Sequence, residues 1–189
     1  MDNVKLLAIV GMSGSGKSEV VDWLTVKGYP KVYFGGMIYK EMEKRGIPRT
    51  EDGESEKAFR EEIRETEGKD WVVRQVINEV KDLISAGQKR IILDGVYSWT
   101  EYKILKHEFP GNLTFVAVVV DKELRYERIK KRAERAFDAK AIRERDRSEI
   151  EGLEKGGPIA AADHYLLNNG TIQELHAGID RILEEIDFD

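Results

Sequence analysis

The fold class is decided by residues 6–18, which read LLAIVGMSGSGKS. The first five residues, Leu6 to Val10, form an unbroken apolar run of the kind found in a parallel strand buried on both faces. The next eight, Gly11 to Ser18, fit the pattern G-x-x-x-x-G-K-S/T, in which a glycine-rich loop joins a strand to a helix. Backbone N–H groups of such a loop, together with the helix N-terminus, cradle phosphate oxygens. The segment therefore predicts an α/β protein that binds a nucleoside triphosphate.

The loop also assigns chemical roles to individual side chains. We expect Lys17 to reach the β- and γ-phosphates of ATP and the Ser18 hydroxyl to ligate Mg²⁺. The residues expected to contact the nucleotide here are Gly11, Ser13, Gly14, Ser15, Gly16, Lys17 and Ser18. ATP and Mg²⁺ are thus the predicted cofactors.

Outward from this loop, short apolar runs alternate with segments of helical periodicity. The runs predict strands at residues 6–10, 32–34, 91–95, 113–120 and 165–167. A helix follows the loop, a second spans 71–87, and the capping box Thr171–Glu174 opens a last one. This order predicts a parallel five-stranded sheet flanked by helices.

Two charged stretches interrupt this pattern and are expected to be insertions into one domain that spans 1–189. Residues of about 35–68 are rich in Glu, Lys and Arg and poor in strand formers, so we expect a small helical insertion that binds the phosphate acceptor. Residues of about 125–155 carry many arginines, which predicts a lid that closes over the nucleotide and excludes water.

Composition excludes several classes of protein. The chain has 189 residues, 31 Lys plus Arg against 36 Asp plus Glu, and a net charge of −5, which argues against nucleic-acid binding. It has no cysteine, which excludes disulfides, Cys-ligated zinc and thiol catalysis. No apolar run is long enough for a membrane span or a signal peptide. We expect a cytoplasmic protein and, without a coiled coil or long apolar patch, a monomer.

Asp94 ends the third predicted strand and precedes Gly95. The carboxyl ends of parallel strands meet at one edge of a sheet, where ligands bind. Asp94 is therefore a candidate for holding Mg²⁺ and for orienting an acceptor hydroxyl.

The chain resembles the nucleoside-monophosphate-kinase branch of P-loop kinases. Ile92-Leu93-Asp94-Gly95 is similar to the strand end of adenylate kinases, and Val120 to Leu124, followed by Arg128 and Arg132, is similar to the segment that leads into their lid. The resemblance implies that Arg128 lies against the adenine and that Arg132 touches the ATP phosphates. Both arginines are accordingly candidate catalytic residues beside Lys17 and Asp94.

Two narrower resemblances concern the rest of the chain. Ala162-Asp163, with Asn168 to Thr171 after it, is similar to the C-terminal run of dephospho-CoA kinases, and it implies that Asn169 and Gly170 contact the nucleotide. Lys44 to Gly46 and Arg145 to Glu149 are similar to segments of an uncharacterised, largely archaeal family of kinase-like proteins.

The chain departs from adenylate kinases where those enzymes grip the acceptor's phosphate with arginines. Tyr39 stands at one such place and Val96-Tyr97-Ser98-Trp99 at the other. Tyrosine cannot make the charged, bidentate contact of a guanidinium. We expect a larger or less phosphate-dependent acceptor, in a pocket that also includes Phe34 and Trp99. The acceptor-binding candidates are Tyr39, Lys40, Tyr97, Arg143 and Arg147.

The leading interpretation is an ATP-dependent phosphotransferase that acts on a small nucleotide or nucleotide-like acceptor. One alternative is a dephospho-CoA kinase, which the run from Asp163 to Thr171 favours. The other is a regulator or ATPase that binds ATP without kinase activity, for which the two tyrosine departures leave room.

Overall fold

The sheet of this protein is all-parallel, with strands in the order β2-β3-β1-β4-β5. A computed structural model describes residues 3–50, 53–131 and 138–189. The strands are β1 (Lys5–Val10), β2 (Lys31–Tyr33), β3 (Arg90–Asp94), β4 (Leu113–Val119) and β5 (His164–Leu167). This confirms the predicted α/β fold and all five strands.

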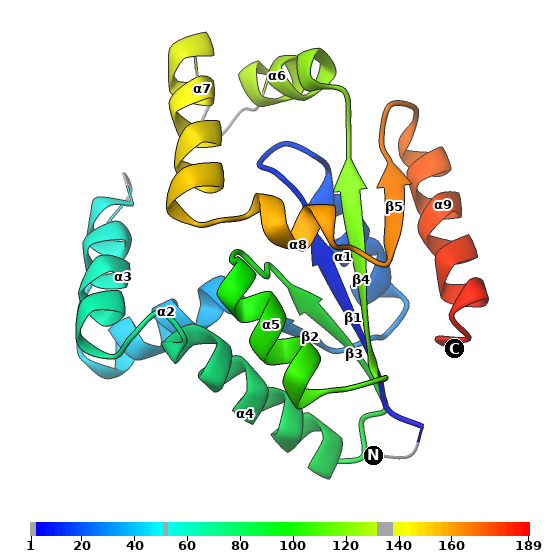
Figure 1. Cartoon of the computed structure of the whole chain (residues 1–189), viewed down its shortest axis with the longest axis horizontal. Helices are drawn as coiled ribbons and strands as arrows, with labels where there is room; N and C mark the ends of the chain where they lie inside the picture. The colour runs from blue at the N-terminus through cyan, green and yellow to red at the C-terminus, as the bar shows by residue number, and fades with distance from the viewer. Residues whose placement is uncertain (1–2, 51–52, 132–137) are drawn as a thin grey trace.

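Helices cover the two faces of the sheet and extend beyond its carboxyl end (Figure 1). They are α1 (Lys17–Val26), α2 (Phe34–Lys44), α3 (Glu54–Thr66), α4 (Trp71–Ser85), α5 (Trp99–Glu108), α6 (Lys122–Lys130), α7 (Ala139–Arg147), α8 (Gly156–Ala160) and α9 (Ile172–Glu185). A π-helical turn, Ser148–Gly152, continues α7. None of the helices in the described ranges combines the length and the apolarity that a bilayer crossing requires.

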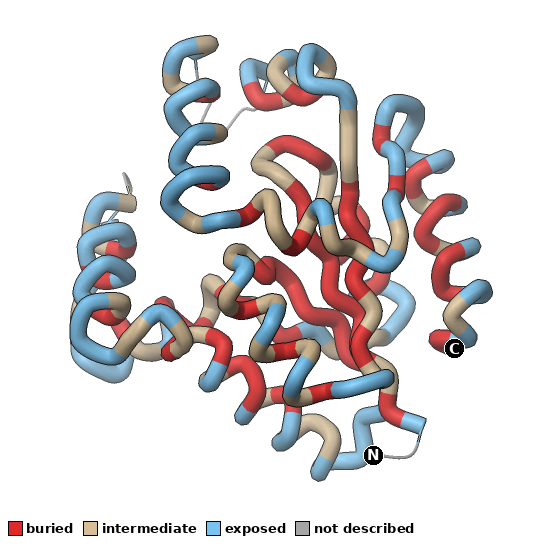
Figure 2. The backbone as a smooth tube through the Cα atoms, viewed as in Figure 1, coloured by how far each residue is buried: buried red, intermediate tan, exposed pale blue. Residues whose placement is uncertain are grey.

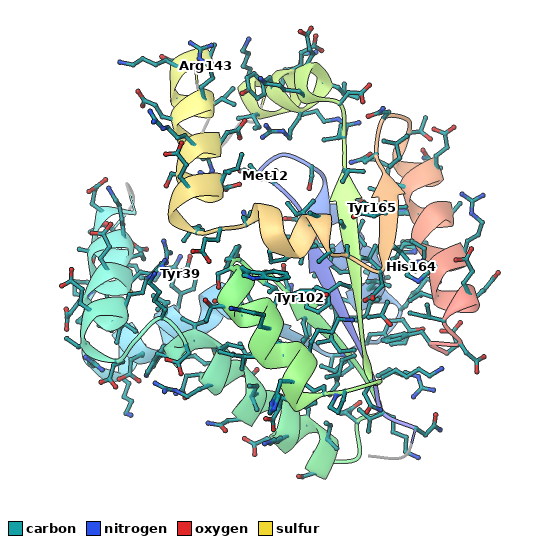
Figure 3. The ribbon with its side chains drawn as sticks, viewed as in Figure 1. Met12, Tyr39, Tyr102, Arg143, His164 and Tyr165 are labelled. Carbon is teal, nitrogen blue, oxygen red and sulfur yellow. The ribbon has the colours of Figure 1, made fainter. Side chains whose placement is uncertain are left out.

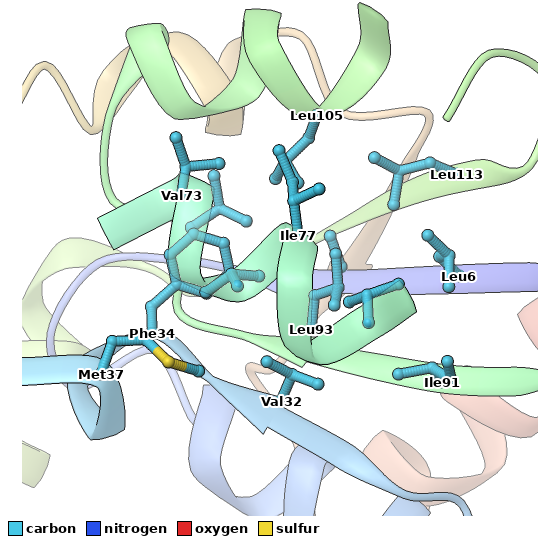
Figure 4. Close-up of a cluster of buried hydrophobic side chains, with 14 of the residues drawn as sticks. Leu6, Val32, Phe34, Met37, Val73, Ile77, Ile91, Leu93, Leu105 and Leu113 are labelled. Carbon is cyan, nitrogen blue, oxygen red and sulfur yellow. The ribbon is translucent and has the colours of Figure 1, made fainter. Parts of the chain in front are cut away.

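The sheet divides the core into two clusters because successive side chains of a strand point to opposite faces. Leu6 and Ala8 of β1 pack with α2, α4 and α5, as Figure 4 shows for Leu6 and its neighbours. Leu7 and Ile9 pack with α1 and α9. The central strands β3, β1 and β4 are accordingly buried along most of their length, whereas the edge strands β2 and β5 and the outer sides of the helices are partly exposed (Figure 2). Each fully buried Leu or Ile contributes about 1.5–3 kcal/mol, so the sheet is a rigid platform for the loops at its edge.

The structure differs from the sequence-based prediction at the end of the second strand and at α5. Phe34 was expected to end the second strand, but it is the first residue of α2. A Cβ added at Gly35 would lie 2.5 Å from the Tyr33 hydroxyl, so the close approach of the Tyr33 ring needs the two glycines that follow Phe34. Helix α5 was not predicted, although Ser98 and Glu101 form a capping box at its start.

Candidate functional site

The phosphate loop opens into a cavity of about 880 Å³ at the carboxyl edge of the sheet. One wall is the loop itself, with Lys17 and Ser18. The opposite wall comes from α2 and α3, and Asp94 lies at the end of β3 between them. A single cavity thus connects the predicted donor site with the predicted acceptor insertion.

The outer side of the phosphate loop is packed so tightly that its glycines cannot be replaced. Gly14 and Gly16 have positive φ angles of +85° and +97°. A Cβ at Gly14 would lie 2.6 Å from Ile129 of α6, and one at Gly16 would collide with the Asn168 amide. Asn168 is buried and donates a hydrogen bond of 2.8 Å to the Ser15 carbonyl. The loop is therefore held from outside while its other side faces the cavity, which is the arrangement that polyphosphate binding needs.

Lys17 and Asp94 form an ion pair at the centre of the cavity. Asp94 is only 8% exposed, so the lysine is its main source of charge compensation. Ser18 lines the same cavity. The Ser18 hydroxyl and the Asp94 carboxylate are hard oxygen donors that suit Mg²⁺ when phosphate oxygens complete its coordination. In the described ranges no three acidic, His or Cys side chains cluster as a metal site made by protein alone.

A buried carboxylate, that of Glu149, accepts a hydrogen bond from a backbone N–H of the phosphate loop. Glu149, in the π-helical turn after α7, accepts a hydrogen bond of 3.0 Å from the Ser13 backbone N–H. The ammonium of Lys155 lies 3.0 Å from the same carboxylate oxygen. Burial lowers the pKa of Lys155, and the adjacent Glu149 opposes this effect. The carboxylate therefore stands where an anionic phosphate oxygen would find the same two donors.

Helices α6 and α7 are tied to the phosphate loop by a second ion pair. Arg125 donates to the Ser13 carbonyl at 2.9 Å and binds both oxygens of Asp146. Tyr126 donates to Asp146 as well, at 2.9 Å. Burial alone would raise the pKa of Asp146, but the hydrogen bonds from Arg125 and Tyr126 hold it below its ordinary value. A displacement of α7 would therefore shift Arg125 and its hydrogen bond to the Ser13 carbonyl.

Arg128, Asn169 and Gly170, which were expected to contact the nucleotide, lie together but do not line the cavity. Arg128 donates to the Asn168 carbonyl at 2.8 Å and lies at 3.5 Å from that of Gly170. The Asn169 side chain accepts a bond from the Asp121 N–H at 2.9 Å. Arg132 lies outside the described residues.

Only some of the acceptor-site candidates face the cavity. Tyr39 and Tyr97 line it. Three others point elsewhere: Lys40 pairs with Glu79 of α4 at 2.5 Å, Arg147 pairs with Glu151 at 2.9 Å, and Arg143 is exposed on α7. Figure 3 shows Arg143 far from Tyr39.

The two further aromatic candidates also differ in placement. Phe34 lines the cavity from within the core. Trp99 stacks on Tyr102 at 4.9 Å and lines a separate depression, so its expected place in the acceptor pocket was wrong.

Tyr33, Tyr39 and Tyr97 form one side of the cavity, which we call the tyrosine wall. Burial keeps the hydroxyls of Tyr33 and Tyr97 uncharged. Tyr97 shares a hydrogen bond with Tyr33, and burial raises the pKa of Tyr97 well above its ordinary value. Burial also raises the pKa of Tyr33. The wall therefore offers neutral hydrogen-bond donors and ring faces to a ligand.

Sequence reasoning missed several charged residues of the cavity. They are Glu101, Glu149 and Lys155 on the wall formed by α5 and the segment between α7 and α8, and Arg60, Arg64 and Lys69 on the wall formed by α3 and the residues after it. Arg60 and Arg64 could have been found, because residues four apart on a helix such as α3 lie on the same face. Lys155 and Glu149 carried no comparable signal, because the contact with Ser13 spans 136 residues of chain.

Comparison with known proteins agrees with this geometry. Residues 7–152 match the family model described as an AAA domain. Among solved structures, TT1252 from Thermus thermophilus covers 96% of this chain and 97% of its own (TM-score 0.64, 17% identity). Shikimate kinase from Bacteroides thetaiotaomicron covers 97% and 98% (TM-score 0.60, 9% identity). Dephospho-CoA kinase from Campylobacter jejuni also covers 97% and 98% (TM-score 0.52, 15% identity). These similarities establish a P-loop kinase-like fold.

Sequence relatives give the family. The UPF0200 protein TK1334 of Thermococcus kodakarensis is 33% identical over 96% of this chain and 97% of its own length. A UPF0200 protein of Sulfurisphaera tokodaii is 32% identical over 98% and 99%. With a P-loop that implies nucleotide binding and a fold shared with small-molecule kinases, the chain belongs to the UPF0200 family.

Proposed function

We propose that this protein is an ATP-dependent phosphotransferase that acts on a small nucleotide or nucleotide-like acceptor. The observation that carries the proposal is the single cavity in which Lys17 and Ser18 face the tyrosine wall, with Asp94 between them. A γ-phosphoryl group held by Lys17 would point toward an acceptor seated against Tyr39 and Tyr97. Such a geometry favours transfer to a bound acceptor over hydrolysis, because the acceptor replaces water.

The residues of this chain would act by position and charge. The loop N–H groups and Lys17 bind the phosphates and stabilise the charge on the transferring group. Ser18 and Asp94 would hold Mg²⁺, which supplies further positive charge to the phosphate oxygens. Once Lys17 turns to the nucleotide, Asp94 is released to accept a hydrogen bond from an acceptor hydroxyl. Lys155 and Arg145 line the same space and add positive charge from the lid side.

The structure gives no separate support to the dephospho-CoA kinase alternative. Asp163, part of the run that favoured it, accepts a hydrogen bond of 2.7 Å from the Phe115 N–H and pairs with Lys106 at 2.9 Å. These contacts join β4 to the segment before β5 and do not reach the cavity. The resemblance at Asp163 is therefore explained by the fold.

The test is ATP-dependent phosphotransfer to a panel of acceptors. The panel contains the ribo- and deoxynucleoside monophosphates, dephospho-CoA, shikimate and gluconate, with Lys17→Ala as the inactive control. We expect turnover with a nucleotide-like acceptor that the control variant abolishes. ATP binding without transfer to any acceptor would refute the proposal and favour a nucleotide-binding regulator.

A further inference from the structure

The wall of the cavity that α3 forms carries a group of cations that make no ion pair with any carboxylate in the described part of the chain. We name Arg60, Arg64 and Lys69 the α3 cation group; the first two belong to α3 and Lys69 lies just beyond it. All three line the cavity. Among residues 3–50, 53–131 and 138–189, no carboxylate forms an ion pair with any of them. The group is thus a patch of positive charge inside the proposed active site, in which Arg64 also attracts the nearby Glu101 carboxyl without forming an ion pair with it.

The acidic side chains of the same cavity are engaged elsewhere. They pair as Glu19 with His176, Asp22 with Lys31, Glu56 with Arg49, Asp94 with Lys17, and Glu149 with Lys155. Glu101 accepts the N–H groups of Tyr97 and Ser98 instead. Burial raises the pKa of Glu101 to about 7, so this carboxyl adds little negative charge below neutral pH. Neutralisation of the α3 cation group within the described protein is therefore weak.

The arrangement also carries an electrostatic cost that a bound anion would relieve. Arg60 and Arg64 stand four residues apart on one helix, where like charges destabilise the helix by about 0.2–0.5 kcal/mol. Two guanidinium groups on one helix face, with an ammonium that lines the same cavity, offer forked donors to a group with several oxygens. A phosphate monoester has three acceptor oxygens and close to two negative charges at neutral pH. A carboxylate has only two oxygens and one charge.

We infer that the acceptor carries a phosphate monoester and that Arg60, Arg64 and Lys69 bind it. The role of this ligand as a phosphate acceptor rests on the proposed function. The presence of a phosphate-binding site at these three residues does not depend on it. It also replaces the expectation of weak phosphate dependence: the cations come from α3 and not from the positions of Tyr39 and Tyr97. The tyrosines then contact the remainder of the molecule, between its phosphate and the Asp94 end of the cavity.

Binding can be measured without phosphotransfer. Calorimetric titration of phenyl phosphate into protein saturated with ADP keeps the phosphate loop filled, and the ring of this probe can pack against the tyrosine wall. Benzoate and phenol serve as the singly charged and neutral probes of similar shape. We expect phenyl phosphate to bind more tightly than benzoate, and phenol not to bind detectably.

The variant Arg60→Gln/Arg64→Gln should weaken phenyl phosphate binding by about tenfold or more, because the loss of even one charged hydrogen bond worth about 1.4 kcal/mol lowers the affinity tenfold. Its matched control is Arg74→Gln, which removes an exposed arginine that pairs with Asp70 on α4 outside the cavity. ADP affinity and the circular dichroism spectrum should be unchanged in both. Arg60 is exposed, so the single variant Arg60→Gln provides a second measurement if the double variant is unstable.

The outcomes separate this inference from the proposed function. Equal binding of phenyl phosphate and benzoate, or equal losses in Arg74→Gln and the double variant, would overturn the phosphate site. Arginine-dependent binding without transfer to any acceptor in the panel would support the site and contradict the kinase. Efficient transfer to an acceptor without phosphate, unaffected by the double variant, would support the kinase and overturn the site.

Discussion

Replacement of Glu149 by glutamine should make nucleotide binding tighter. The Glu149 carboxylate accepts a hydrogen bond from the Ser13 N–H at 3.0 Å and is paired with Lys155. A phosphate that uses the loop donors must first displace this carboxylate. Glutamine has nearly the same size, but its amide oxygen is a neutral and weaker acceptor.

The magnitude follows from the difference between the two hydrogen bonds. A bond to a charged group contributes about 1.5–3 kcal/mol and a neutral one about 0.5–1.5 kcal/mol, so displacement becomes easier by about 1–1.5 kcal/mol. The dissociation constant for ADP should fall by about five- to tenfold, since about 1.4 kcal/mol corresponds to a factor of ten. Isothermal titration calorimetry of ADP, without and with Mg²⁺, measures this change.

The same substitution should lower the stability of the nucleotide-free protein. Lys155 is buried, and removal of one partner of a buried ion pair costs about 3–5 kcal/mol. For a chain of this size a loss of about 3 kcal/mol lowers Tm by about 6–12 °C. Saturating ADP should recover part of this loss, because the phosphates supply the missing negative charge.

The matched control is Glu151→Gln. Glu151 lies in the same π-helical turn but is exposed and pairs with Arg147 on the surface. It should change neither ADP affinity nor Tm. If folded Glu149→Gln protein bound ADP with unchanged or weaker affinity, the idea that Glu149 competes with phosphate would be refuted.

Three further predictions concern fold and loop. Burial raises the pKa of Glu101 from 4.5 to about 7, so its stabilising contribution is complete below pH 4.5 and is lost by about pH 7, a change of about 3 kcal/mol. Glu101→Gln should therefore be more stable than the parent at pH 8 in urea unfolding; an unchanged difference between pH 5 and pH 8 would contradict this. Asp163→Ala should cost about 1–3 kcal/mol because it leaves the buried Phe115 N–H without its acceptor, whereas Asp163→Asn should recover much of that; equal losses in thermal melts would argue against the hydrogen bond. Gly16→Ala should lower Tm and weaken ADP binding by at least about tenfold, since it strains a left-handed residue and displaces Asn168; normal affinity would show that the loop can adapt.

Local features of the sequence were sufficient for the strands and the phosphate loop. The run Leu6–Val10, the glycine spacing that follows it and the capping box at Thr171 all act within a few residues, so their patterns survive without tertiary context. The same local reasoning failed at Phe34, whose apolar character fits a strand as well as a helix start. It also overlooked the capping box that begins α5 at Ser98.

The composition of the cavity depended on contacts between distant parts of the chain. Arg143 and Arg147 looked equivalent to other lid arginines in sequence, yet the rotation of α7 and the following turn directs Arg145 and Glu149 into the cavity instead. Asn168 reaches Ser15 across 153 residues, because β5 and α9 return to the edge where β1 ends. The fold class and the phosphate loop could be predicted because short-range spacing encodes them. Which charges meet at the loop could not be predicted, because packing between distant segments sets the direction of each side chain.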